Sequence, residues 1–286
     1  TMNDSFAFSG GETLMVTYQV VAGNTDSTKL FDTGISNSVK CGSSNGLDGG
    51  HDENKVTLYT PVLKITKEAD KKTLNTGDEA EYTLTVEQLT DGAKAWNARV
   101  TDSLGDKSFE SGAFIIPDSL SVTDGDGNDI TKVDTTKITF VGKSSDDASE
   151  KIDQASGFEV KTAAAVEYGK PVIVKYTVRF GGNDSIDLAG MDVDNIAKAD
   201  SDNNIWETTD NETVNVYKPV LAAEKESDAS SISQGDEANY MVTITQQVDG
   251  AIARNIGLID IMPYVGDASD LSADQIMDSI EFRIDG

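Results

Sequence analysis

The feature that most constrains the fold is an internal repeat. Pro61 begins the segment PVLKITKEAD, and Pro219 begins the related segment PVLAAEKESD 158 residues later. An ungapped comparison of residues 61–104 with residues 219–262 gives 19 identities in 44 positions. Self-similarity at a fixed offset indicates repeated structural units. The chain is therefore predicted to consist of tandem copies of one domain.

The same offset divides the whole chain. Near the N-terminus Asn37 corresponds to Asn195, so the repeat extends on both sides of the central copy. The predicted parts are the C-terminal part of one repeat (residues 1–60), a complete repeat domain (residues 61–218) and the N-terminal part of the next repeat (residues 219–286). Because the sequence begins within the repeat pattern, we interpret it as a mature or excised fragment.

Alternating apolar residues indicate strands. Tyr82, Leu84 and Val86 alternate with polar residues, and the segment 172–178 has the same period of two. Turn-forming pairs such as Asp91-Gly92 separate these runs, and long helical periodicity is absent. Many short strands with regular turns are typical of antiparallel sandwiches. The predicted fold class is all-β, with tandem immunoglobulin-like antiparallel β-sandwiches.

Charge and composition exclude several functions. The 286 residues include 50 acidic and 23 basic side chains, a net charge of -27. Phosphate binding needs clustered Lys and Arg, so we expect neither nucleic acid nor anionic membrane as a partner. No run approaches 18 apolar residues, so no membrane insertion is predicted. One cysteine, Cys41, allows no internal disulfide, and the single His51 cannot complete a zinc site with it.

Three polar residues occupy positions that the strand alternation turns toward the core. Lys67 shares a face with Leu63 and Ile65, Asp102 with Ala98 and Val100, and Asn195 with Val193 and Ala197. The partial repeats have the same polar residues, namely Lys225, Asp260 and Asn37. Buried Lys, Asp and Asn are costly unless they satisfy one another. We therefore expect the three side chains of each complete repeat to meet.

Such a meeting permits covalent chemistry. Burial disfavours the charged forms of Lys67 and Asp102, and a neutral lysine amine is a nucleophile. A protonated Asp102 can polarise the Asn195 carbonyl and transfer protons. Attack of the amine on the carboxamide carbon expels ammonia and leaves an amide between two strands. This is a single-turnover reaction of the protein on itself.

The chain resembles the isopeptide-forming domains of Gram-positive fimbrial and adhesin proteins, specifically their Lys–Asp–Asn type. The residues that carry the resemblance are 61–67, Gly77-Asp78, 82–86, 100–104, 195–197 and Asp202-Asn203. The resemblance implies display on a bacterial cell surface, a stalk or adhesive role, and Lys67–Asn195 cross-linking assisted by Asp102. It also implies equivalent roles for Lys225, Asp260 and Asn37. No sorting signal or cell-wall anchor is visible in the sequence.

Other readings remain open at this point. Lys67 could extend to solvent and Asp102 could cap a turn. The terminal half-repeats could complement one another between chains, which would make the protein a subunit of an extracellular fibre or pilus. A glycosidase with paired carboxylates is a further hypothesis, but no motif selects one pair, so we expect no enzyme with turnover. Expected partners are neighbouring repeats, further copies of the chain and an unidentified host or surface ligand.

A calcium loop is the remaining candidate site. Asp124, Asp126 and Asn128 lie in the segment DGDGND, whose spacing resembles a calcium loop. The glutamate at the EF-hand position is missing, and no helices flank the segment. Asp-Gly pairs are strong signals for hairpin turns, so the turn is the favoured interpretation. No cofactor is expected apart from this possible calcium ion.

Overall fold

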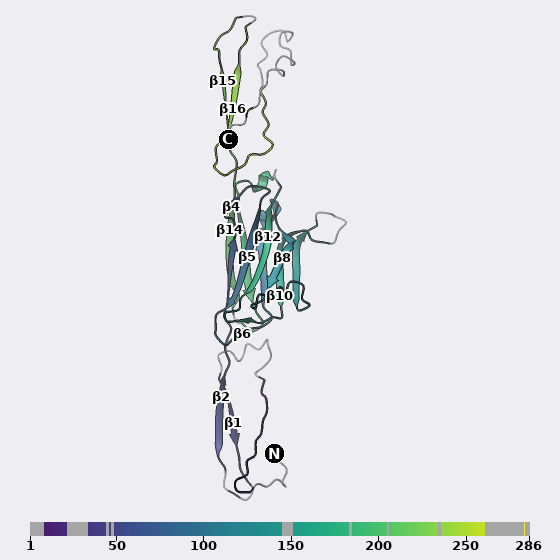
Figure 1. Ribbon diagram of the computed structural model, residues 1–286, viewed down its shortest axis with the longest axis vertical. Helices are drawn as coiled ribbons and strands as arrows, with labels where there is room; N and C mark the ends of the chain where they lie inside the picture. The colour runs from purple at the N-terminus through teal and green to yellow at the C-terminus, as the bar shows by residue number, and fades with distance from the viewer. Residues whose placement is uncertain are drawn as a thin grey trace. The chain divides into compact units, whose positions relative to one another are not determined.

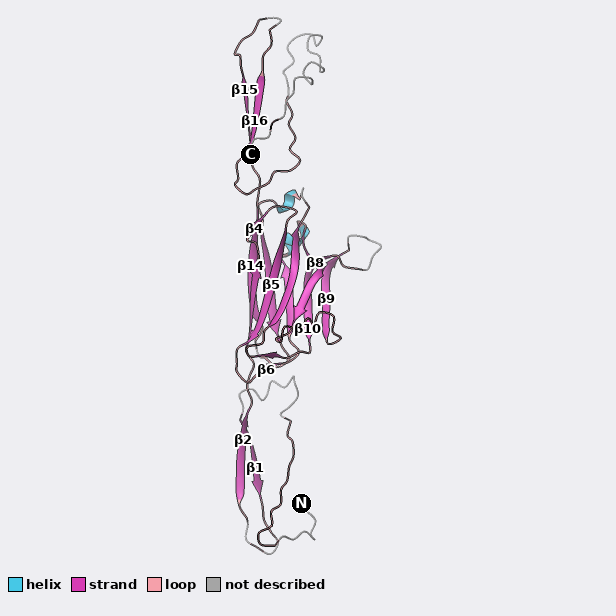
Figure 2. Cartoon of the chain, viewed as in Figure 1, coloured by secondary structure: helices cyan, strands magenta, loops and turns pink. Residues whose placement is uncertain are grey.

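The computed structural model describes residues 9–21, 34–43, 46, 49–144, 151–182, 185–204, 206–233, 236–260 and 283. The chain divides into two compact units, Thr1–Ala253 and Arg254–Gly286. All the strands described below lie in the first unit, and Figures 1 and 2 show them as arrows.

The central part of the first unit is a β-sandwich of two antiparallel layers. One layer has the strand order β3 (Leu63–Ala69), β5 (Glu79–Gln88), β12 (Val172–Phe180) and β8 (Ala113–Thr123). The other has the order β9 (Thr136–Lys143), β10 (Gln154–Thr162), β7 (Arg99–Leu104), β13 (Asp192–Asp200) and β14 (Thr208–Val216). Pairing of Ala155 with Ile115 joins β10 to β8, so the two layers form one continuous sheet path.

Short elements complete the sandwich. The two-residue strand β4 (Thr73–Leu74) runs parallel to β14, and β6 (Lys94–Ala95) pairs with β11 (Val166–Glu167). The described helices are a five-residue α-helix, α1 (Asp106–Glu110), and a 3-10 turn at Ile186–Leu188. Helices therefore contribute little to the layers.

Side chains of β14 accept hydrogen bonds from backbone N–H groups on the open edge of β3. The backbone N–H of Lys67 donates to the Asp210 carboxylate over 2.8 Å, and the N–H of Ile65 donates to the Thr208 hydroxyl over 3.4 Å. An edge strand otherwise presents unpaired N–H groups. These two bonds bring the first and the last long strands of the path together, and they place Lys67 beside the layer that carries β7 and β13.

The core follows the alternation of the sequence. In β12 every second residue is buried, from Val172 to Phe180. Tyr82 and Tyr176 are among the largest side chains that are fully enclosed, and both come from adjacent strands of one layer. Because period-two alternation puts one face of each strand against the other layer, the apolar residues fill the space between them. The predicted all-β fold class with immunoglobulin-like antiparallel layers is confirmed.

Two hairpins lie outside the sandwich. β1 (Gly34–Lys40) pairs with β2 (His51–Thr57), and β15 (Leu221–Ser227) pairs with β16 (Tyr240–Gln246). Both are antiparallel, as expected for the partial repeats. The predicted boundaries at residues 60 and 218 stay predictions.

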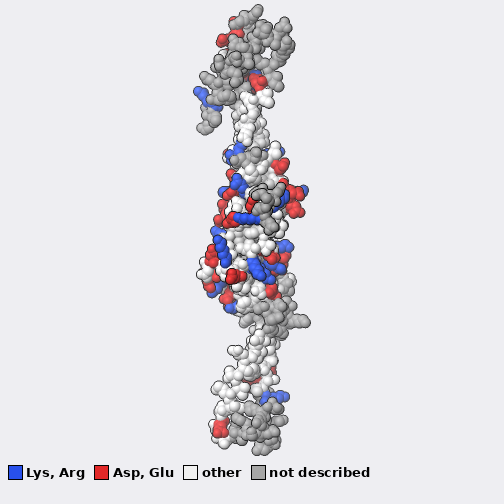
Figure 3. All heavy atoms as spheres, turned by 90° about the vertical axis from the view of Figure 1, so that its right-hand side faces the viewer, with Lys and Arg blue, Asp and Glu red and all other residues white. Residues whose placement is uncertain are grey.

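The surface of the sandwich mixes both signs of charge. On the face shown in Figure 3, Lys and Arg are interspersed with Asp and Glu and do not gather into one basic patch. Surface ion pairs such as Lys175–Glu81 and Lys198–Glu207 account for part of this mixing. Within the described parts of the chain, no helix has the length and apolar character that crossing a membrane requires.

A glycine on β10 tests the close approach of the strands around the site. A Cβ added to Gly157 would lie 2.5 Å from the Asp102 carbonyl oxygen on β7. We expect Gly157→Ala to lower the free energy of unfolding by about 1–3 kcal/mol, because the neighbouring backbone must move. Denaturant unfolding measures the change. Gly105→Ala is the control, since its Cβ would meet only ordinary contacts, and equal midpoints for the two variants would contradict the prediction.

Candidate functional site

The three predicted polar residues converge in the core from three strands. Lys67 lies on β3, Asp102 on β7 and Asn195 on β13, and their exposed fractions are 3%, 2% and 0%. In the antiparallel pair of β7 and β13, Asp102 is opposite Ala197, so Asn195 is its diagonal neighbour on the same inward face. The polar residues that alternation placed on the inner face are indeed buried together.

Tyr176 links the lysine to the asparagine. Its hydroxyl oxygen accepts a hydrogen bond from Lys67 Nζ at 2.8 Å and another from Asn195 Nδ2 at 2.9 Å. A hydroxyl has two acceptor lone pairs and one donor. With both lone pairs used, its proton is left for the Asp102 carboxyl, with which it interacts. Lys67 Nζ also forms an ion pair with Asp102 Oδ2, and both side chains are fully buried.

Aromatic rings surround this cluster. Tyr82 and Tyr176 stack with ring centroids 5.5 Å apart, and the edge of Phe158 meets Tyr176 at 5.0 Å. Lys67 Nζ lies 5.1 Å from the centroid of Tyr82. The rings exclude water from the amine and supply cation–π attraction when it is charged. The environment of the cluster is therefore dry.

Burial changes the proton affinities of the pair. Burial lowers the pKa of Lys67 to about 8, although the neighbouring Asp102 opposes the shift. Burial also raises the pKa of Asp102, against the opposing effects of Lys67, Tyr176 and Asn195. Both shifts favour the neutral forms, an amine and a carboxylic acid. The neutral pair holds the same number of protons as the ion pair, so one internal proton transfer interconverts them.

Two buried oxygens in the cluster have no hydrogen-bond partner among the described residues. They are Oδ1 of Asp102 and Oδ1 of Asn195. Two acceptors cannot satisfy each other without a proton between them, and buried acceptors left unsatisfied are costly. A proton on Asp102 would supply that donor to the Asn195 carbonyl. The same proton would make the carboxamide carbon more electrophilic.

The geometry therefore assembles the parts of an amide transfer. Lys67 has an amine whose neutral form burial favours, Asn195 has a carboxamide, and Asp102 has a carboxyl whose protonated form burial favours. Tyr176 holds the amine and the carboxamide on one oxygen atom. The aromatic residues were not predicted as site residues, although the repeat contains a signal for two of them. Tyr82 corresponds to Tyr240 and Tyr176 to Tyr18, both at inward positions of the pattern.

The corresponding residues of the partial repeats lie in exposed surroundings. Lys225 is on β15 and Asn37 is on β1, and both are exposed. Asp260 is exposed and belongs to the second unit, outside any described helix or strand. In this structure only the trio of the central repeat is assembled among the described residues. The roles of the outer residues stay predictions.

The suggested calcium segment forms a hairpin turn. Asp124 Oδ1 accepts hydrogen bonds from the backbone N–H groups of Asp126 and Asn128, and Asp126 forms an ion pair with Lys170. These bonds, together with the Asn128 side chain, lower the pKa of Asp124. Within the described residues no group of three or more His, Cys, Asp and Glu side chains is placed to hold a metal ion. The contacts of Asp124 are those of a turn, which is the interpretation that the sequence favoured.

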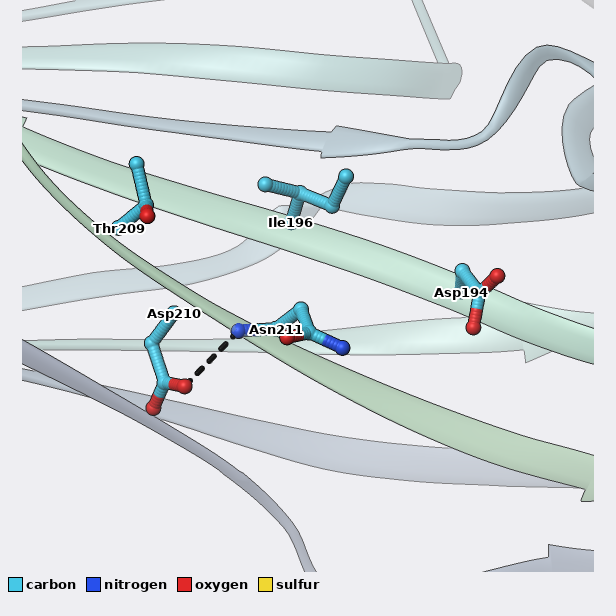
Figure 4. Close-up of a pocket in the computed structure, with 5 residues that line it drawn as sticks. All are labelled: Asp194, Ile196, Thr209, Asp210 and Asn211. Carbon is cyan, nitrogen blue, oxygen red and sulfur yellow. Dashed lines mark hydrogen bonds between the residues drawn. The ribbon is translucent and has the colours of Figure 1, made fainter.

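A surface hollow lies on β13 and β14. Figure 4 shows the residues that line it, which are Asp194, Ile196, Thr209, Asp210 and Asn211. Asp210 Oδ1 accepts the Asn211 N–H at 2.9 Å, while Oδ2 accepts the Lys67 N–H inside. One carboxylate oxygen therefore ties β14 to β3, and the other is used within β14. We assign this hollow a structural role in holding the first strand.

Comparisons with known proteins yield structural likeness only. No protein-family model matches the chain, and no curated protein matches it by sequence. Among solved structures, the pilus backbone protein of Streptococcus pneumoniae matches with 17% identity and a TM-score of 0.35, over 48% of this chain and 31% of that chain. The chain therefore spans about a third of that protein's length.

Two further structures are similar. The C-terminal domain of the AgI/II polypeptide BspA of Streptococcus agalactiae matches with 18% identity and a TM-score of 0.36, over 66% of this chain and 60% of that one. The major pilin SpaA of Corynebacterium diphtheriae matches with 10% identity and a TM-score of 0.35, over 60% and 46%. At these identities and TM-scores the likeness carries no argument about function, which depends on the site's geometry.

Two buried tyrosines allow a matched test of the bridging hydroxyl. Tyr176→Phe removes the oxygen that holds Lys67 and Asn195, and we expect amide formation to slow by roughly tenfold to a hundredfold, the equivalent of one hydrogen bond to a charged group. Mass spectrometry during refolding measures the rate. Tyr82→Phe is the control, because the Tyr82 hydroxyl has no hydrogen-bond partner in the described structure. Equal rates for the two variants would show that the Tyr176 hydroxyl does not contribute to amide formation.

The shared proton predicts a bell-shaped pH profile. Reaction needs a neutral Lys67 and a protonated Asp102, which together hold one proton. Above pH about 8, the value to which burial lowers the pKa of Lys67, the pair loses that proton and the acid is lost. Sufficient acidity adds a second proton and removes the nucleophile. Chain kept unfolded and then refolded at several pH values should react fastest between these limits, and a rate that rises steadily to pH 10 would contradict it.

Proposed function

We propose that the chain is a structural stalk or adhesin module of a bacterial cell-surface protein, and that an isopeptide bond between Lys67 and Asn195 reinforces it. The observation that carries the proposal is a buried amine and a buried carboxamide that share one tyrosine hydroxyl, with a buried carboxyl paired to the amine. Nothing in the packing of an ordinary sandwich requires these groups. A buried ion pair is often less stable than apolar residues of similar volume.

The reaction balances within the protein. Lys67 Nζ, in its neutral form, attacks Asn195 Cγ, while Asp102 gives its proton toward the Asn195 carbonyl oxygen. The tetrahedral intermediate then loses its amide nitrogen as ammonia, which takes up the proton released by the lysine nitrogen. A new C–N bond replaces the old one, and Asp102 ends with the proton it began with. No cofactor enters, and the protein turns over no substrate.

The bond would change how the domain carries force. It joins β3, the first strand, to β13, near the end of the sheet path, and closes the loop from residue 67 to residue 195. Tension entering at β3 would pass to β13 through covalent bonds and would bypass the core. The chain-entropy treatment of cross-links gives a stabilisation of about 4–5 kcal/mol for a loop of ~100 residues. These properties suit an extracellular module exposed to shear and proteases.

Intact mass with peptide mapping tests the bond. We expect the folded chain to be lighter than its sequence by one ammonia per bond, and digestion to release a branched peptide that joins Lys67 to Asn195. Lys67→Ala and Asn195→Ala should each restore the full mass at this site. Lys64→Ala is the matched control, because Lys64 lies on the same strand but is exposed and pairs with Glu87. A linear map of folded wild-type chain would refute the proposal.

Stability provides an independent readout. Lys67→Ala prevents the cross-link and leaves the Asp102 carboxyl buried without the lysine, so we expect a loss of about 4–5 kcal/mol in the free energy of unfolding, the stabilisation that the cross-link would supply. Thermal or denaturant unfolding measures the effect. Lys64→Ala should stay within about 0.5 kcal/mol of wild type, as surface substitutions usually do. Similar melting of the two lysine variants would count against a stabilising bond.

A further inference from the structure

A row of register partners crosses the layer of β10, β7, β13 and β14 at the level of the site. Phe158 is opposite Asp102, and Asp102 is opposite Ala197. Ala197 is in turn opposite Asp210 on β14. Directly opposed residues point to the same face of a sheet, and here that face is the buried inner one. Two carboxyl groups therefore lie in one row, two strands apart, with the small Ala197 between them.

Lys67 is bound by both carboxyl groups of this row. Its backbone N–H donates to Asp210 Oδ2 at 2.8 Å, and its side-chain Nζ forms the ion pair with Asp102 Oδ2. Neighbouring strands lie about 4.8 Å apart, so β14 and β7 are about 10 Å apart along the row. The lysine therefore spans the row, with its backbone beside β14 and its amine at β7.

The position of the lysine backbone determines where the amine can reach. A lysine side chain is a flexible stem, so its end is confined only if its Cα is fixed. On one side of β3 the ladder to β5 fixes the strand, with Lys67 opposite Leu84. On the other side the strand is bonded to Thr208 and Asp210. Of these two side chains, Asp210 is the one that binds the lysine itself.

The internal repeat distinguishes Asp210 from its neighbours on β14. Three polar residues alternate along one face of this strand, namely Thr208, Asp210 and Glu212. At the offset of 158 residues their counterparts are Gly50, Asp52 and Asn54. The aspartate alone is identical in both copies. The repeat therefore retains the carboxylate whose counterpart binds the lysine N–H, and it does not retain the residues on either side.

Asp210 also acts on the amine through its charge. Burial lowers the pKa of Lys67 to about 8, against the opposing charges of Asp102, Asp210 and Glu212. The titratable groups around the amine are Asp102 on β7, Asp210 and Glu212 on β14, Tyr176 on β12 and Tyr82 on β5. A nearby carboxylate favours the protonated amine. An amide at position 210 would keep an acceptor oxygen and lose this charge, so the two effects are separable.

We propose that Asp210 is a positioning residue for the cross-link: its carboxylate holds the backbone N–H of Lys67 and thereby directs the amine across the row toward Asp102 and Asn195. The inference rests on the proposed function, since it concerns the same bond. Asp210 exchanges no proton with the reacting atoms and acts through the position of β3. The bond that forms, the bond that breaks and the ammonia that leaves are unchanged.

Two alanine variants of the 286-residue chain separate positioning from general support of the edge. Asp210→Ala removes the acceptor at Lys67, whereas Thr208→Ala removes the 3.4 Å bond to the nearby Ile65 N–H. We expect Asp210→Ala to slow amide formation by roughly tenfold to a hundredfold, the equivalent of one hydrogen bond to a charged group. Thr208→Ala should slow it less, because its bond is longer and does not involve the lysine.

The rates are measured on chain that is kept unfolded and then refolded. Mass spectrometry follows the loss of ammonia, and circular dichroism follows folding in the same samples. Equal slowing by Asp210→Ala and Thr208→Ala overturns the inference. It is also overturned if the slower reaction of Asp210→Ala is fully accounted for by slower folding.

Asp210→Asn supplies the second readout, and it serves by itself if the alanine variant does not fold. The amide oxygen can still accept the Lys67 N–H, so at its optimum pH we expect this variant to react faster than Asp210→Ala. Its rate should fall at a lower pH than that of wild type, because loss of a neighbouring negative charge lowers the pKa of Lys67 further. A rate no higher than that of Asp210→Ala, or an alkaline limit at the wild-type pH, overturns the inference.

Asp194 provides the matched charge control. It lines the same surface hollow as Asp210, is exposed, and accepts a hydrogen bond from the Thr213 hydroxyl at 2.6 Å (Figure 4). Asp194→Asn removes one negative charge from the hollow and leaves the contacts of Lys67 in place. We expect the wild-type rate and the wild-type alkaline limit. A limit that moves as far as that of Asp210→Asn would indicate a general charge effect and would overturn the inference.

The outcomes also separate this inference from the proposed function. Absence of the Lys67–Asn195 peptide from folded wild-type chain refutes the proposed function. If wild type forms that peptide and Asp210→Ala forms it at the same rate, the present inference alone is overturned.

Discussion

The buried pair of Lys67 and Asp102 is the constraint on which the rest of the structure depends. Two ions without solvent cost several kcal/mol each, and their attraction offsets that cost only with good geometry and further hydrogen bonds. Here burial lowers the pKa of the amine and raises that of the carboxyl, so the pair is poised toward its neutral form. Amide formation would remove the amine altogether. The reaction would therefore remove the desolvation cost of the buried amine.

The topology of the sandwich determines how such a bond would affect resistance to force. β3 is an edge strand whose second side is held by Asp210 and Thr208 on β14 and not by a full ladder. Side-chain bonds of this kind give way more easily than a continuous set of backbone bonds. A covalent link from Lys67 to β13 would secure a strand that has a full backbone ladder on one side only. The site and the weak edge are parts of the same arrangement.

The partial repeats show how local and tertiary contributions differ. The bond from Asn37 to Tyr18 and the placement of Lys225 over Tyr240 reproduce contacts of the sandwich in exposed surroundings. Strand register sets the local partners of Asn37 and Lys225. Exclusion of water from these side chains requires a second layer. Without that layer the side chain of Lys225 stays in contact with water. Completion of the sandwich is thus the step that would turn local contacts into a reactive site.

The sequence by itself determined the period of the repeat, the strands and the inward positions of Lys67, Asp102 and Asn195, because period-two alternation depends only on the chain. It did not determine Tyr176 as their common partner, nor the use of Asp210 to hold β3. Those contacts join residues up to 143 positions apart. Alternation assigns a side chain to a face, but the order of strands in space, with β12 beside β5 and β13 beside β7, decides which inward side chains meet. Only the packed layers set that order and excluded the water.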